Sequence, residues 1–134
     1  MVKQAIVIVT GERKENPDIW GFSGQFKQYE GLICDMMEFV MSNGGRLTDA
    51  DTGKPLTSEK KALESVRFVR DKIIGAIAPM GVLTYEEPES LDLFIQGKVV
   101  FMRNWPYAWK VSNDPDRSKA VEKVGIAKLP IFLG

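Results

Sequence analysis

Apolar positions along the chain recur at two different spacings, which predict alternating strands and helices. Residues 19–25 alternate bulky and small side chains, and residues 99–102 form a continuous apolar run, so both segments are predicted strands. Apolar residues recur at helical spacing in 28–43, 58–75 and 87–96, with charged residues between them. The predicted elements therefore describe an α/β protein whose helices lie between strands.

The segments between these elements carry turn-forming residues. The Asn43-Gly44-Gly45 run ends the first predicted helix, and Thr57 or Ser58 is expected to cap the second, which we extend through Ile77 before residues 75–81 break it. The polar run 46–56 predicts a hairpin or loop.

Three further segments complete the prediction. Residues 2–14 mix apolar and polar residues ambiguously and favour a helix slightly over a strand, with a turn expected at 15–18. Residues 124–127 predict a last strand.

The strand predicted at 99–102 is expected to lie in the interior of the sheet, because all four of its residues are apolar.

Composition limits what such a fold could do. The chain has 134 residues, 44% of them hydrophobic, which suits a single domain spanning 1–134. Its 18 basic and 18 acidic side chains cancel, which argues against a nucleic-acid partner. No apolar stretch near the start is long enough for a signal peptide or a membrane span, so we expect neither in this chain. Histidine is absent, which removes the usual neutral-pH acid or base.

The most informative local feature is the aromatic run that follows the predicted strand 99–102. Pro106 suits the first turn of a helix, with Asn104 or Trp105 as its cap. Trp105 and Tyr107 would then lie at the strand-to-helix junction, where open α/β sheets meet their ligands. Flat aromatic rings pack against sugar rings, and neighbouring amides and hydroxyls bond their rims, although aromatic residues equally often fill a core. We expect Trp105 and Tyr107 to lie side by side, partly exposed, at the rim of a concave surface.

Two other clusters have simpler interpretations. Residues 49–53 are similar to the start of a calcium loop, but glycine stands fifth where that loop needs it sixth, so a turn held by side-chain hydrogen bonds is expected and no metal site. Glu86, Glu87 and Glu89 could be a glycosidase carboxylate pair, but acids before a helix more simply complement its dipole. No catalytic residue and no cofactor is therefore predicted.

Several motifs, in this order, resemble family 1 solute-binding proteins of ABC sugar importers, with trehalose- and maltose-binding members the most similar. They are WGF (20–22), YEGL (29–32), SNGG (42–45), FIQGKVVFM (94–102), NWPYAW (104–109) and VGIAKLP (124–130). The resemblance implies one lobe of a type II periplasmic-binding-protein-like fold, a central sheet with helices on both faces. It further implies that the chain is part of a C-terminal lobe, without the N-terminal lobe that completes the cleft.

The resemblance also implies a function. The full-length family binds a di- or oligosaccharide such as maltose or trehalose outside the cytoplasm and delivers it to an ABC transporter permease. Trp105 and Tyr107 match positions that face the sugar, Gln25, Tyr29 and Asn104 are further candidates, and Trp109 is expected to pack inward. Two alternatives stay open: a glycoside hydrolase-like enzyme, and a structural remnant that binds no sugar and pairs with a second copy through its exposed lobe surface.

Overall fold

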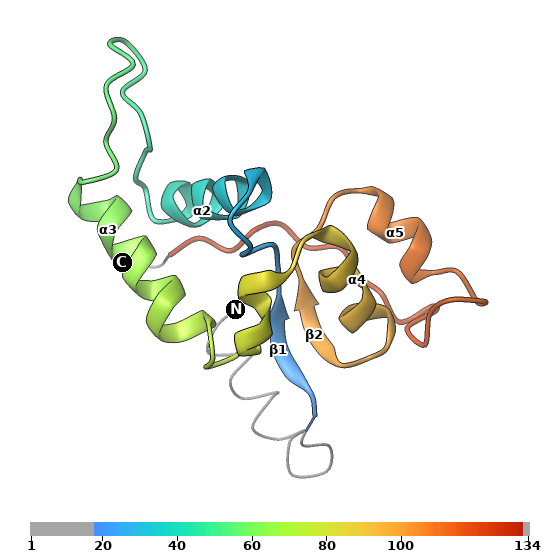
Figure 1. Cartoon of the computed structure of the whole chain (residues 1–134). Coiled ribbons are helices and arrows are strands. Elements are labelled where there is room, and N and C mark those ends of the chain that lie inside the picture. The colour runs from blue at the N-terminus through green and yellow to red at the C-terminus, as the bar shows by residue number, and fades with distance from the viewer. Residues whose placement is uncertain (1–17, 133–134) are drawn as a thin grey trace.

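The computed structural model describes residues 18–132, and within them helices lie between the two strands, as expected (Figure 1). The predicted helix at 2–14 and most of the turn at 15–18 lie outside these residues. The elements are β1 (Trp20–Ser23), α2 (Glu30–Ser42), α3 (Lys60–Phe68), η1 (Val69–Ile73), η2 (Met80–Thr84), α4 (Glu87–Ile95), β2 (Val99–Met102) and α5 (Tyr107–Ser112).

The two strands pair in parallel, although most of the described chain separates them. Trp20 lies opposite Val99, and Phe22 lies opposite Phe101. Both predicted strands are thus confirmed, whereas residues 18–132 do not show the interior position expected for 99–102. Among the described residues β2 pairs with β1 alone, whereas the outer edge of β1 donates two backbone N–H groups to the carbonyl of Ile77.

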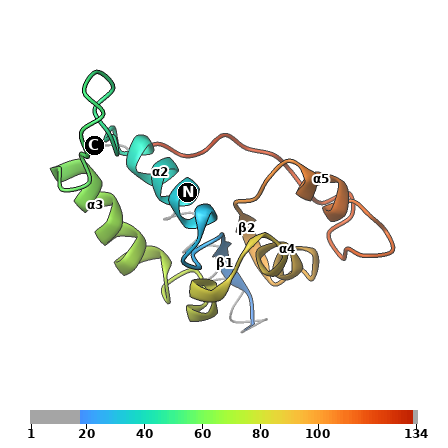
Figure 2. The same ribbon diagram turned by 45° about the horizontal axis from the view of Figure 1, so that its top comes forward.

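Helices cover both faces of this small sheet, as predicted. Phe22 and Phe101 point to one face, where they pack against residues of α2, α3 and η1. Met102 points to the opposite face and packs against a cluster contributed by α4 and α5, and Ser23 there donates to the carbonyl of Ser90 in α4. Figure 2 shows the same division, with α2 and α3 on one side of the strands and α4 and α5 on the other.

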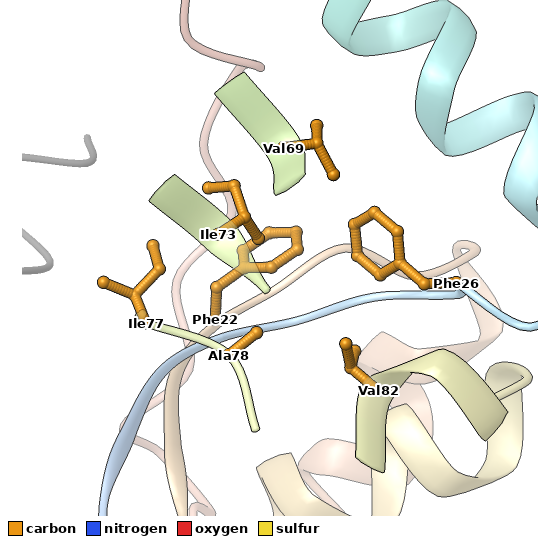
Figure 3. Close-up of a cluster of buried hydrophobic side chains, with 7 residues drawn as sticks. All are labelled: Phe22, Phe26, Val69, Ile73, Ile77, Ala78 and Val82. Atoms are coloured by element: carbon orange, nitrogen blue, oxygen red, sulfur yellow. The ribbon is translucent and has the colours of Figure 1, made fainter. Parts of the chain in front are cut away.

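The larger core forms where β1 meets the turns that follow α3. Its buried members, drawn in Figure 3, are Phe22, Phe26, Val69, Ile73, Ile77, Ala78 and Val82. The rings of Phe22 and Phe26 meet edge to face, with centroids 6.3 Å apart. This packing holds the chain immediately after β1 in a defined position.

Glycines follow two of the helices, as expected for the helix at 28–43. Gly44 follows α2 and Gly97 follows α4, both in the left-handed region that other residues rarely adopt. The predicted hairpin also forms, closed by a bridge between Thr48 and Pro55, and it projects away from the sheet (Figure 1).

The second predicted helix differs from the expectation in its start and its end. It begins at Lys60 with Glu59 as the cap residue, so neither Thr57 nor Ser58 caps it. Its regular part ends at Phe68, and one wider turn, η1, follows. Ile77 therefore lies beyond the helix, and it reaches the core from a turn whose N–H groups converge on the Ile73 carbonyl.

The strand predicted at 124–127 is absent, because the segment finds no partner strand among residues 18–132. Val124 is half-buried, but Ile126 is largely exposed. An apolar run forms a strand only where a neighbouring strand takes up its backbone groups. None of the helices formed by residues 18–132 has the length and apolar character needed to cross a membrane.

Candidate functional site

The candidate site lies at one edge of the sheet, where both strands end. Because β1 and β2 are parallel, Gln25 and Arg103 follow them at the same edge, and the N–H of Arg103 donates to the Ser23 carbonyl at 2.9 Å. Glu87, the first residue of α4, reaches this edge as well, since it hydrogen-bonds Trp105. The strand ends and the helix starts thus bring together residues that are far apart in sequence.

Trp105 and Tyr107 are partly exposed at this edge, as predicted, with 41% and 46% of their surfaces accessible. Trp109 is 47% exposed, so the expectation that it packs inward is wrong. The reason is which residue of α5 faces the core: Ala108 packs against Leu91 and Ile95, while Tyr107 and Trp109 on either side of it are exposed. Pro106 precedes the helix with helical backbone angles, in agreement with its expected place in the first turn.

The indole of Trp105 is held on its edge and on one face. Its Nε1–H donates to Oε1 of Glu87 at 2.9 Å. The guanidinium carbon of Arg103 lies 4.2 Å from the centre of the ring, in a cation–π contact. With so much of its surface still exposed, Trp105 presents a ring of fixed orientation to solvent.

Asn104 stabilises the turn that carries Trp105. Its Oδ1 accepts the backbone N–H of Trp105 at 2.8 Å, and its Nδ2 donates to the carbonyl of Glu87 at 3.0 Å. The side chain therefore ties the end of β2 to the start of α4. It does not cap α5, whose first turn begins with a bond from Ala108 to the Trp105 carbonyl.

Gln25 and Tyr29 lie close to the same group, but neither side chain is free at the surface. Gln25 is fully buried; its Nε2 donates to the Arg103 carbonyl at 3.0 Å and its Oε1 accepts from Arg103 Nη1 at 2.9 Å. The hydroxyl of Tyr29 is enclosed and has no hydrogen-bond partner among the described residues. Burial raises the pKa of Tyr29, and the neighbouring carboxylate of Glu87 raises it further.

Arg103 links these residues, and the sequence analysis did not find it. Its side chain is only 8% exposed, and it donates to Glu38 of α2 through Nε and Nη2. Asp35 Oδ1 lies 3.0 Å from the same Nε, whose N–H is directed at Glu38, so this second contact is an ion pair without a hydrogen bond. An arginine after a strand gives no signal in a single sequence, because only pairing of the strands brings it against Gln25 and α2.

Burial also sets the charge state of Asp35. The residue is 1% exposed, and its burial raises its pKa to about 7, although Oδ2 accepts the N–H of Gln25 at 2.8 Å and Arg103 lies alongside. Burial acts in the same direction on Glu87, but there the hydrogen bond from Trp105 and nearby groups outweigh it and the pKa falls below its usual value. At neutral pH the edge therefore presents a charged Glu87.

Two of the three acids at the start of α4, Glu86 and Glu89, have structural roles, whereas Glu87 holds Trp105. Glu86 pairs with Lys27, and the backbone N–H of Glu86 donates to Glu89 Oε2 at 2.9 Å. The loop at 49–53 is likewise a turn, in which Asp49 Oδ1 accepts from the backbone and hydroxyl of Thr52. Within residues 18–132 no cluster of acidic or cysteine side chains could hold a metal ion.

Comparisons with known proteins agree with this architecture. Residues 13–134 match the model of the family described as bacterial extracellular solute-binding protein. The chain is 39% identical over 123 residues to a probable ABC transporter-binding protein of Deinococcus radiodurans, covering 92% of this chain and 29% of that protein. It is 28% identical over 89 residues to a probable amino-acid ABC transporter periplasmic-binding protein of Sinorhizobium fredii, covering 66% of this chain and 20% of that protein.

Solved structures give the same result. Maltose-bound T. maritima MalE3 superposes with a TM-score of 0.85 at 37% identity, over 96% of this chain and 32% of that one. A ribitol complex of a solute-binding protein from Agrobacterium radiobacter K84 superposes with a TM-score of 0.84 at 24% identity, over 100% of this chain and 33% of that one, and supports the fold alone. The chain thus spans about a third of the length of these relatives. It belongs to the bacterial extracellular solute-binding protein family.

Proposed function

We propose that this chain contributes one wall of a binding site for a neutral di- or oligosaccharide, such as maltose or trehalose. The observation that carries the proposal is the exposed, immobilised indole of Trp105 at the edge where β1 and β2 end. A sugar ring can stack on such an indole, because its C–H groups pack against the flat aromatic face. Tyr107 adds a second exposed aromatic surface two residues further along.

The charges around Trp105 favour a neutral ligand over an anionic one. Glu87 is ionised at the edge of the indole. Burial raises the pKa of Tyr107, and the negative charges of Glu87 and Asp92 raise it further, so these two carboxylates act on the same surface. The nearby Arg103 is enclosed and already paired with Glu38. A ligand carboxylate would meet repulsion and no free guanidinium, whereas sugar hydroxyls can donate to the Glu87 carboxylate.

A role in uptake follows from the family. Its members include proteins named for ABC transporters, and the 37% identical MalE3 is solved with maltose bound. In the longer protein, a second lobe would complete the cleft and an ABC permease would receive the sugar outside the cytoplasm. We further propose that the chain is not an enzyme, since the three acids that could be imagined as a catalytic pair all have structural partners. Glu86 pairs with Lys27, Glu87 accepts from Trp105, and Glu89 accepts from the backbone of Glu86.

Titration calorimetry tests the proposal on the chain itself. Maltose, trehalose and maltotriose are titrated, with glutamate and a neutral amino acid as comparisons, because one relative is named for amino-acid transport. We expect weak binding of at least one sugar and none of glutamate. Binding of an amino acid in preference to every sugar would overturn the proposal. So would the absence of sugar binding at sugar concentrations of roughly tens of millimolar, which exceed the dissociation constant of even a weak complex.

The hydrolase alternative is tested in the same samples. Release of reducing sugar from maltotriose, lost on replacing Glu87 by Gln but not Glu89 by Gln, would support it. We expect no release from any of these proteins.

A further inference from the structure

We propose that Arg103 positions Trp105 for binding, by closing one face of the indole so that a ligand ring stacks on the opposite face. This inference deepens the proposed function and rests on it for the identity of the ligand. The guanidinium carbon of Arg103 lies 4.2 Å from the centre of the indole and so covers one of its faces. Trp105 is still 41% exposed. The exposed surface must therefore lie largely away from Arg103.

Arg103 is itself held in place from three directions. Glu38 of α2 accepts hydrogen bonds from Nη2 at 2.6 Å and from Nε at 3.1 Å. Gln25, which follows β1, accepts one from Nη1 at 2.9 Å. Asp35 Oδ1 lies 3.0 Å from Nε. The guanidinium thus has partners along its whole rim, and only its two flat faces are left for stacking.

The indole has little freedom to rotate above this plane. Glu87 accepts its Nε1–H at 2.9 Å, while Asn104 fixes the backbone N–H of the same residue. An aromatic ring held at one edge and along one face keeps one orientation before any ligand arrives. Binding then costs less conformational entropy than it would on a freely rotating side chain.

Arginine suits this position better than lysine. A guanidinium is planar and can stack on an indole while it donates to carboxylates in its own plane. An ammonium group could neutralise Glu38 and Asp35 but would cover much less of the ring. Arg103→Lys therefore separates the stacking from the charge.

The test measures exposure of the Trp105 ring without any sugar. Trp20 and Trp109 are first replaced by Phe, which leaves Trp105 as the sole indole of the chain. Acrylamide quenching of its fluorescence is then compared between this parent chain and its Arg103→Lys and Arg103→Met variants. We expect both substitutions to raise the quenching constant, Arg103→Met about twofold, because two faces of the ring become accessible instead of one. Arg70→Met, in η1 and paired with Asp71, is the control and should change nothing.

Two outcomes would overturn the inference. One is a folded Arg103→Lys chain, judged by circular dichroism, whose quenching equals that of the parent. The other is an equal rise in Arg70→Met. If Arg103→Met fails to fold because Glu38 and Asp35 lose their partner, Arg103→Lys still decides the question, since it keeps the charge.

A sugar titration separates this inference from the proposed function. If a sugar binds the parent chain, Arg103→Lys should weaken it by roughly threefold to tenfold, as expected when a binding surface loses its preorganisation. Unchanged affinity in Arg103→Lys, with affinity lost in Trp105→Ala, would refute the positioning role and leave the proposed function standing. Raised quenching with no sugar binding by the parent would refute the proposed function alone.

Discussion

The carboxylate of Asp35 occupies the space where a side chain on residue 24 would begin. A Cβ built on Gly24 would lie 2.7 Å from Asp35 Oδ2 and 3.0 Å from the ring of Phe22. Glycine at this position lets the carboxylate reach the backbone N–H of Gln25, so the loop after β1 and helix α2 lock together.

Gly24→Ala should therefore lower the free energy of unfolding by about 1–3 kcal/mol, the usual cost of overpacking a rigid site. Urea unfolding followed by circular dichroism measures the change. Gly125→Ala is the control, because nothing lies within 4 Å of the position that its methyl group would take. A Gly24→Ala chain as stable as the parent would contradict the close packing described here.

Asp35 should make stability depend on pH. Burial raises its pKa to about 7 from an unfolded value near 3.8, so the folded state binds the proton more tightly. The contribution of this group is fully present below pH 4 and is lost as pH rises toward 7. Asp35→Asn should therefore show a smaller fall in the free energy of unfolding between pH 4 and pH 8 than the parent. Asp51→Asn, in the exposed hairpin, should reproduce the parent's slope, and identical slopes in all three chains would exclude a raised pKa at Asp35.

Tyr29 offers a test of an unsatisfied hydroxyl. Its oxygen is buried and makes no hydrogen bond of ordinary geometry within residues 18–132, although the Glu87 carboxylate lies near enough to raise its pKa. Removing the oxygen therefore relieves the cost of burying a poorly satisfied polar group. Tyr29→Phe should leave the free energy of unfolding unchanged or raise it by up to about 1 kcal/mol. Thermal unfolding compares it with Tyr107→Phe, whose hydroxyl belongs to an exposed residue. A fall of more than about 1 kcal/mol in the free energy of unfolding would mean that the hydroxyl makes a stabilising hydrogen bond.

Trp105→Ala should separate binding from folding. The side chain is largely outside the two buried cores, so circular dichroism and unfolding should change little. Sugar affinity should fall by about 1–3 kcal/mol, the range for a lost aromatic contact, most clearly in the longer protein that completes the cleft. Trp109→Ala, equally exposed on α5, is the matched control. Equal losses in the two variants would remove Trp105 from the binding surface.

Sequence patterns predicted those elements whose local signal and tertiary setting agree. The run at 99–102 became β2 because β1 was available to pair with it, whereas the similar run at 124–127 found no partner among the described residues and stayed irregular. The helical spacing of apolar residues likewise continues in the sequence from α3 through Ile77. The backbone nevertheless leaves the helix at Ile73, and the turn that follows brings Ile77 into the core. Periodicity reports which side chains seek burial, and it does not report which backbone conformation delivers them.

The candidate site shows the same division. Aromatic residues next to proline after a strand pointed to Trp105, Tyr107 and Asn104, and the structure places them at the expected edge. Arg103 was missed because its burial depends on partners contributed by β1 and α2, far away in the chain. The inward position predicted for Trp109 failed because Ala108 already faces the neighbouring helix.

The parallel pairing of β1 with β2 also bears on how the chain folds. Trp20 pairs with Val99 across most of the described chain, so the entropy of closing a long loop must be overcome before the strands contribute any stability. Chains dominated by such distant contacts fold slowly. The edge that carries Trp105 is assembled by this pairing, so the edge exists only once the long loop between the strands has closed.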